Sequence, residues 1–168
     1  MTRKYHYGFT IVELLVVLAI VTILAITAVP SFITYLQTSR LTSASQNLYY
    51  ALQYARTEAL KRNATVYVSF QTGSSWCYGI NAGATCSCNV ANSCGLGSTS
   101  APAASQLTLT ASGLASGAVH FEPNHGAAGA TSTITLTDAQ GIAMSVKVRV
   151  LGSLLLCSAQ VSGYSACT

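Results

Sequence analysis

The sequence is poor in charged residues. Asp, Glu, Lys and Arg together make up 7% of its 168 residues, and only four residues are acidic. A typical soluble domain has about a quarter of its residues charged. No pair of carboxylates and no Ser-His-Asp arrangement emerges from the spacing, so we expect neither an enzyme nor a cofactor. A formal net charge of +4 also excludes a strongly basic protein.

Charge is most scarce near the N-terminus, where residues 14–39 contain no charged side chain. As a helix, such a run is about 39 Å long, enough to cross the hydrocarbon of a bilayer. One carboxylate, Glu13, stands at its N-terminal edge, where a charge that enters lipid is costly. Arg3 and Lys4 precede the run and predict a cytoplasmic N-terminus, with the remaining domain outside.

The segment Gly8-Phe9-Thr10-Ile11-Val12-Glu13-Leu14-Leu15 resembles the processing site of type IV pilins and type II secretion pseudopilins. The resemblance implies that a prepilin peptidase cuts between Gly8 and Phe9 and methylates Phe9. It also implies that Glu13 compensates the charged N-terminus of a neighbouring subunit. An ordinary secretory signal is the first alternative, but its apolar region is shorter. A plain membrane anchor is the second, and it leaves the carboxylate unexplained.

The family resemblance implies an α+β, pilin-like fold with a long N-terminal helix packed on an antiparallel β-sheet. Its segments are a leader peptide (1–8), a transmembrane or filament-core half-helix (9–38), an amphipathic half-helix (39–63) and a periplasmic β-rich domain (64–168). Pro30 lies inside the helix and predicts a kink. The amphipathic stripe consists of Leu41, Ala44, Leu48, Leu52, Ala55 and Ala59. Asn63 is the predicted helix stop.

Alternating patterns after the helix predict strands separated by turns and by one cysteine-rich loop, 81–105. The predicted strands are 64–70, 76–80, 106–111, 118–122, 132–137, 142–150 and 153–157. We expect them to form an antiparallel meander. More narrowly, three features resemble the GspH/FimT group of minor pilins and pseudopilins. They are the helix end 54–62, the turn 121–124 with Gly126 nearby, and Gly152 before an apolar strand.

Six cysteines in an exported domain predict disulfides, with fifteen connectivities allowed by sequence. A zinc site is the alternative, but the spacing C-x8-C-x-C-x5-C lacks the paired cysteines of structural zinc modules. The pilin resemblance implies that Cys157 pairs with Cys167. The remaining four could then pair in three ways, and they are Cys77, Cys86, Cys88 and Cys94.

Two further groups of side chains are candidate sites. His120, His125 and Glu122 could be drawn as metal ligands, but a solvated pair of histidines on a strand and turn is the preferred interpretation, and no metal is expected. Tyr49, Tyr50 and Tyr54 are interpreted as residues that pack against the sheet and against neighbouring subunits, rather than as an interaction patch.

Some FimT-type pilins take up DNA through a C-terminal Gly-Arg-x-Arg motif. Here that stretch reads Gly152-Ser153-Leu154-Leu155, so both arginines are replaced. The candidates that remain, Lys147 and Arg149, lie two apart on a predicted strand and share one face. Two cations predict at most a weak, salt-sensitive contact.

Three functions follow from the resemblance. The first is a minor pilin that helps to initiate or cap a type IV pilus at the inner membrane, with other pilins as partners. The second is the H-type pseudopilin of a type II secretion system. The third is a DNA receptor at the pilus tip. The first two functions require the same sequence features, so these features do not separate them. The cysteine-rich loop and the C-terminal cysteines favour the pilus.

Overall fold

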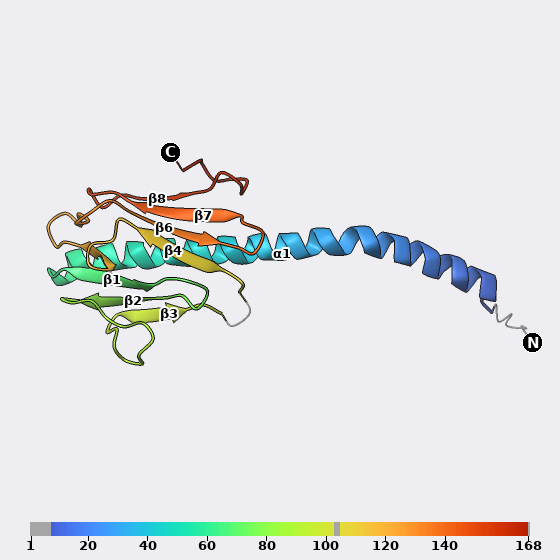
Figure 1. Ribbon diagram of the computed structural model, residues 1–168, viewed down its shortest axis with the longest axis horizontal. Coiled ribbons are helices and arrows are strands. Elements are labelled where there is room, and N and C mark those ends of the chain that lie inside the picture. The colour runs from blue at the N-terminus through green and yellow to red at the C-terminus, as the bar shows by residue number, and fades with distance from the viewer. Residues whose placement is uncertain (1–7, 103–104, 168) are drawn as a thin grey trace, which may run out of the picture. The chain divides into compact units, whose positions relative to one another are not determined.

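The computed structural model describes residues 8–102 and 105–167, apart from the side chains of residues 27–30. The chain divides into two compact units, Met1–Gln37 and Thr38–Thr168, which are taken separately below. One helix, α1 (Ile11–Arg62), runs through both units, and the strands that follow it all lie in the second (Figure 1).

Both ends of α1 are capped by residues next to it. At the start, the Thr10 hydroxyl accepts a hydrogen bond of 3.2 Å from the Glu13 amide, as an N-cap residue does. At the end, Asn63 takes a left-handed φ of 50°. The amides of Asn63 and Ala64 then donate to carbonyls of the last helical turn, which is the Schellman arrangement. The prediction that the helix stops at Asn63 is confirmed.

In the second unit, one face of α1 is buried. The buried residues recur at spacings of three and four and are Leu41, Ser45, Leu48, Leu52, Ala55, Glu58 and Ala59. The predicted amphipathic stripe is therefore confirmed, with Ser45 buried where Ala44 was expected and Ala44 half-buried beside it. A helix with a single buried face needs a sheet on one side only.

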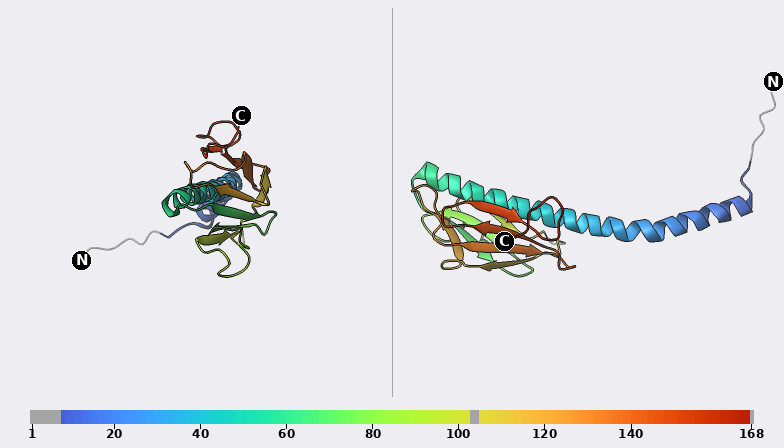
Figure 2. Two further views of the ribbon diagram at one scale, coloured as in Figure 1. Left: turned by 90° about the vertical axis from the view of Figure 1, so that its left-hand side faces the viewer. Right: turned by 90° about the horizontal axis from the view of Figure 1, so that it is seen from above.

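Two four-stranded antiparallel sheets cover that face, and the strands lie on one side of the helix (Figure 2). The first has the order β3-β2-β1-β5, formed by β1 (Val66–Gln71), β2 (Cys77–Ala82), β3 (Gly97–Ser100) and β5 (Ala118–Phe121). The second has the order β4-β6-β7-β8, formed by β4 (Thr108–Ser112), β6 (Ser132–Thr137), β7 (Ala143–Val148) and β8 (Leu154–Cys157).

The prediction of a single meander is wrong. The chain leaves the first sheet to form β4, returns to it for β5, and leaves again for β6. The short link from β4 to β5 suggests a hairpin, but it joins two different sheets. Part of the predicted loop 81–105 is also a strand, β3. Its sequence Gly-Ser-Thr-Ser has no apolar residue, so alternation gave no signal for it.

The hydrophobic core lies between the two sheets and the second half of α1. Along β6 and β7 every second residue is buried, as expected for strands with one face toward a core. The largest fully buried side chains are Phe121, Leu41, Leu48, Leu52, Leu109, Ile134, Leu136, Met144, Val66, Val68, Val146 and Val148.

Candidate functional site

The first unit exposes apolar side chains all around the helix. Every described side chain in residues 8–26 and 31–36 is exposed, and most of them are large and hydrophobic. Among the described residues, α1 is the one helix long and apolar enough to cross a membrane. The helix continues through position 30, but the side chain of Pro30 lies outside the described residues, so the kink stays a prediction.

The predicted processing and assembly residues stand together at the start of α1. Gly8 and Phe9 precede the first turn and are exposed, whereas the leader residues 1–7 lie outside the described part of the chain. Glu13 lies in the first turn, where its backbone amide is bonded to Thr10. Among the described residues, its carboxylate has neither an ion pair nor a hydrogen bond. The exposed carboxylate of Glu13 is the one charge on this half of the helix among the described residues. It can therefore pair with a positive charge on another molecule.

The three disulfides join Cys157 to Cys167, Cys77 to Cys88 and Cys86 to Cys94. The first is the pair that the resemblance implies, and the other two select one of the three pairings left open. No group of three or more potential metal ligands occurs within residues 8–102 and 105–167.

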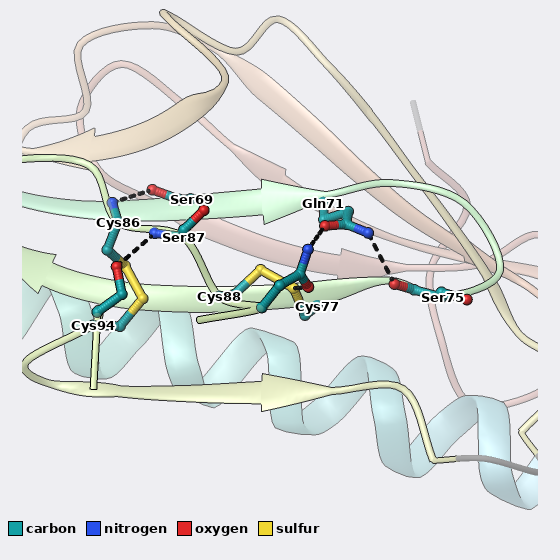
Figure 3. The surroundings of a disulfide bond; sticks show 10 residues. Ser69, Gln71, Ser75, Cys77, Cys86, Ser87, Cys88 and Cys94 are labelled. Carbon is teal, nitrogen blue, oxygen red and sulfur yellow. Dashed lines mark hydrogen bonds between the residues drawn. A yellow bond between two sulfur atoms is a disulfide. The ribbon is translucent and has the colours of Figure 1, made fainter. Parts of the chain in front are cut away.

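The cysteine-rich loop lies against one face of β2 (Figure 3). Gly79 makes room for it, because a Cβ at this position would come within 2.2 Å of Cys94 Sγ and 2.9 Å of Cys86 Sγ. The Cys86 amide donates to Ser69 Oγ on β1 at 3.1 Å, and the Asn89 side chain donates to that of Gln71. The loop is therefore fixed to the first sheet by covalent and hydrogen bonds.

The segments that carry the narrower resemblance meet around Arg56. Its Nε donates to the Gly126 carbonyl at 3.2 Å, and its guanidinium also reaches the His125 carbonyl at 3.4 Å. Gly126 and Gly152 both have positive φ and are buried. A Cβ at Gly152 would lie 1.9 Å from the Gly126 carbonyl oxygen, so only glycine fits.

This contact joins the helix end, the turn and Gly152, since Arg56 is bonded to the turn and the turn lies directly against Gly152. The sequence indicated Arg56 only as part of the helix end 54–62. The signal that could have found the contact is the pair of glycines in turns far apart in the chain.

The candidate DNA contacts are weaker than the sequence suggests. Lys147 on β7 is half-buried and its Nζ donates to the Cys167 carbonyl at 3.3 Å. Arg149 is exposed but lies one residue beyond the end of β7, so the two do not share a strand. His120 packs against the Tyr67 ring and is half-buried, whereas His125 is an exposed turn residue.

The tyrosines of α1 behave differently from one another. Tyr49 is half-buried and its hydroxyl accepts a hydrogen bond from Gln53, in agreement with a packing role. Tyr50 and Tyr54 are 64% and 43% exposed, so they do not pack against the sheet, and their packing against neighbouring subunits stays a prediction.

Two family models match the chain. The model described as type II transport protein GspH matches residues 44–153, which is more than half of the sequence. The chain belongs to the GspH family. The second model, the prokaryotic N-terminal methylation motif, matches residues 3–29. This GspH-family chain therefore carries the motif at the place where the sequence predicted processing. No curated protein matches it.

Two solved structures have the same fold as this GspH-family chain. Both are crystal structures of the type IV minor pilin FimU of Pseudomonas aeruginosa (strain PAO1). The form in space group P21 is 19% identical, has a TM-score of 0.54, and the match covers 73% of this chain and 91% of that one. The form in space group P65 is also 19% identical, with a TM-score of 0.50 and coverage of 69% and 91%.

The family and the fold confirm the expected pilin architecture, one long N-terminal helix packed on antiparallel sheets. Proteins of this family are structural subunits rather than enzymes. The methylation motif and the exposed apolar helix indicate a pilin anchored in a membrane. Membership also implies association with other pilins in a pilus or pseudopilus.

Proposed function

We propose that the protein is a minor pilin of a type IV pilus and helps to initiate or cap pilus assembly at the inner membrane. The observation that carries the proposal is the apolar half of α1, whose described side chains up to Leu36 are all exposed and which is stable only where lipid or other apolar helices surround it. Lipid surrounds it before assembly and the helices of other pilins surround it afterwards. Such a subunit supports adhesion, twitching or DNA uptake by the pilus.

The proposed route to the filament begins with processing. Prepilin peptidase removes residues 1–8 and methylates Phe9, while the chain spans the inner membrane with its N-terminus in the cytoplasm and its C-terminal domain in the periplasm. Glu13 then compensates the amino group of a neighbouring subunit, because an unpaired charge inside an apolar bundle is strongly unfavourable. The absence of a partner for Glu13 among the described residues supports this role.

Mass spectrometry of the native protein tests the processing. We expect the mature chain to begin at N-methylated Phe9 and, without reduction, to be six hydrogens lighter than the fully reduced form because of the three disulfides. A native chain that begins at any other residue would overturn the proposal.

The alternative is the H-type pseudopilin of a type II secretion system, and the description of the matching family model favours it. The likeness to FimU, whose printed name is a type IV minor pilin, favours the pilus. Deletion of the gene in its host separates the two. Loss of surface pili with normal export of secreted enzymes supports the pilus, and the reverse result supports secretion.

A DNA receptor at the pilus tip is the second alternative. It needs several phosphate contacts, and Lys147 is already bonded to the Cys167 carbonyl. An electrophoretic shift of duplex DNA by the purified protein at low salt would support it, and no shift at low salt would dismiss direct binding.

A further inference from the structure

Two of the four outer sheet edges, those of β4 and β5, are partly covered by the chain itself, and a third is bonded one residue beyond the end of β8. Each of β4, β5 and β8 has a neighbouring segment hydrogen-bonded along or directly beyond its outer edge. The bonds run from Leu109 N to Gly73 O (3.1 Å), from Gly129 N to His120 O (3.4 Å) and from Ser158 N to Ser165 O (3.0 Å). Covering an edge prevents another chain from pairing with it.

The fourth edge, the outer side of β3, is open. No backbone hydrogen bond between described residues reaches it. The Ala101 amide donates to the Trp76 carbonyl beside β2, so by alternation Ser98 and Ser100 point their amides and carbonyls outward. All four residues of β3 are exposed, and none is a proline or a charged residue that would block an added strand.

A groove lies beside this edge, between α1 and β3. It consists of two adjoining cavities of about 450 and 420 Å³, which share Asn47, Tyr78 and Thr99 in their walls. The exposed Tyr50 and Tyr54 stand on the helix side of the second cavity. Cavities of this size hold side chains or small ligands.

The wall of the first cavity contains a buried donor without an acceptor. Trp76 is 3% exposed and stacks on Tyr78, with the ring planes 4° apart. Among the described residues, its indole N–H has no hydrogen-bond partner. Such a group is costly when it is buried without an acceptor.

We propose that the open edge of β3 accepts an extended strand from another pilin of the same filament. The added strand pairs with the backbone of Ser98 and Ser100, and every second side chain of that strand enters the groove. This inference rests on the proposed function, because it takes a neighbouring subunit as the partner. The open edge of β3 is then the surface of the globular domain that binds the neighbouring pilin.

Charge narrows the chemistry of the added strand. Arg40 is the single charged residue that lines either cavity, and it makes no ion pair with any described residue. It lies in the same cavity wall as Ser100, at one end of β3. The matching strand is therefore uncharged along the groove and carries one carboxylate at the Ser100 end.

Photo-cross-linking in the host tests the proposal on the full-length protein. A photoreactive phenylalanine analogue replaces Ser98 on the open edge, Thr110 on the covered edge strand β4, or Phe32 on the apolar helix. We expect adducts with other pilins from Ser98 and Phe32, and little from Thr110. Mapping by mass spectrometry is expected to place the Ser98 adduct in an extended segment of the partner.

A pair of substitutions separates backbone pairing from side-chain contact. In Ser100→Pro the outward amide is lost and the edge is blocked, whereas the inward pairing with β2 is kept. In Ser100→Ala the amide remains and only the hydroxyl is lost. We expect the proline variant to lower the Ser98 adduct about tenfold, and the alanine variant to leave it nearly unchanged. Intact disulfides and unchanged Trp76 fluorescence show that both variants fold.

The outcomes are distinct. A Phe32 adduct without a Ser98 adduct, or a Ser98 adduct with sugar instead of protein, overturns the strand proposal and leaves the minor-pilin function standing. Equal Ser98 adducts in the proline and alanine variants also overturn it. Absence of both the Phe32 and Ser98 adducts in cells that assemble filaments overturns the proposed function together with the strand.

Discussion

The two halves of α1 bury their side chains in opposite ways. In the first unit, every described helical side chain up to Leu36 is exposed, although most of them are apolar. In the second unit, one residue in three or four is fully buried and the remaining faces are polar or exposed. The second half is stabilised by its own domain, whereas the first half needs partners from outside. The second half of α1 thus contributes to the folding of its own domain, and the first half to assembly with other molecules.

The two carboxylates of α1 show the same contrast. Glu13 has no partner among the described residues. Glu58 is 5% exposed and is bonded to Lys61 at 3.5 Å and to Arg62 at 2.5 Å. An acid that is already paired contributes to the fold that contains it, and an unpaired one is available to another molecule.

The first prediction concerns Glu13. We expect Glu13→Ala to insert into the membrane normally but to be lost from sheared filaments, because the amino group of its neighbour would be buried without a counter-charge. Membrane fractionation and immunoblots of sheared filaments measure the two steps separately.

Thr10→Ala is the matched control for Glu13. It removes the N-cap at a cost of about 1 kcal/mol but keeps the carboxylate, so incorporation is expected to persist. Normal incorporation of Glu13→Ala into filaments would contradict the proposal that Glu13, unlike Glu58, pairs with another subunit.

The second prediction compares a leucine from each half. Leu52 is fully buried, so Leu52→Ala leaves a cavity and lowers the free energy of unfolding by about 2–5 kcal/mol. Leu24 is 62% exposed, and Leu24→Ala is expected to leave that free energy unchanged. Trp76, the single tryptophan, is buried and reports unfolding by fluorescence of the full chain in detergent. Equal losses in the two variants would contradict the division.

The third prediction concerns the residue that ends the buried half. Asn63 has a φ of 50°, which a β-branched residue adopts only with strain. We expect Asn63→Val to cost about 1 kcal/mol in the same unfolding assay. Asn63→Gly, which tolerates this φ, is expected to be nearly neutral. A valine variant as stable as the glycine variant would mean that the cap does not hold the helix end.

Sequence reasoning worked where a local signal existed. The charge-free run and Glu13 predicted the apolar half of α1, and apolar residues at spacings of three and four predicted the buried stripe through Leu48 and Leu52. Asn63 and the strands with strict alternation, such as β6, were also found. In each case, the property lies in a few consecutive residues.

What the sequence did not predict depends on contacts between distant residues. The assignment of β4 and β5 to different sheets depends on packing rather than on the residues of their short link. β3 has no apolar side chain to mark it, and its open edge is visible only from the way in which the strands pair. The role of Arg56 similarly requires Gly126 and Gly152 to be brought together by the fold.

The smallest expected effect is the pH dependence that Glu58 contributes. Its hydrogen bond with Arg62 lowers its pKa below the usual 4.5. Because the pKa is lower in the folded state than in the unfolded state, the stabilisation is present above about pH 4.5 and is lost as the pH falls through the folded pKa.

We expect Glu58→Gln to lower the unfolding temperature slightly at neutral pH and to reduce the further fall of that temperature in acid. Glu122→Gln, at an exposed carboxylate without an ion pair among the described residues, is expected to leave the acid dependence unchanged. If the Glu58 and Glu122 variants respond alike, the paired acid contributes nothing to the fold, and the contrast with Glu13 then rests on burial alone.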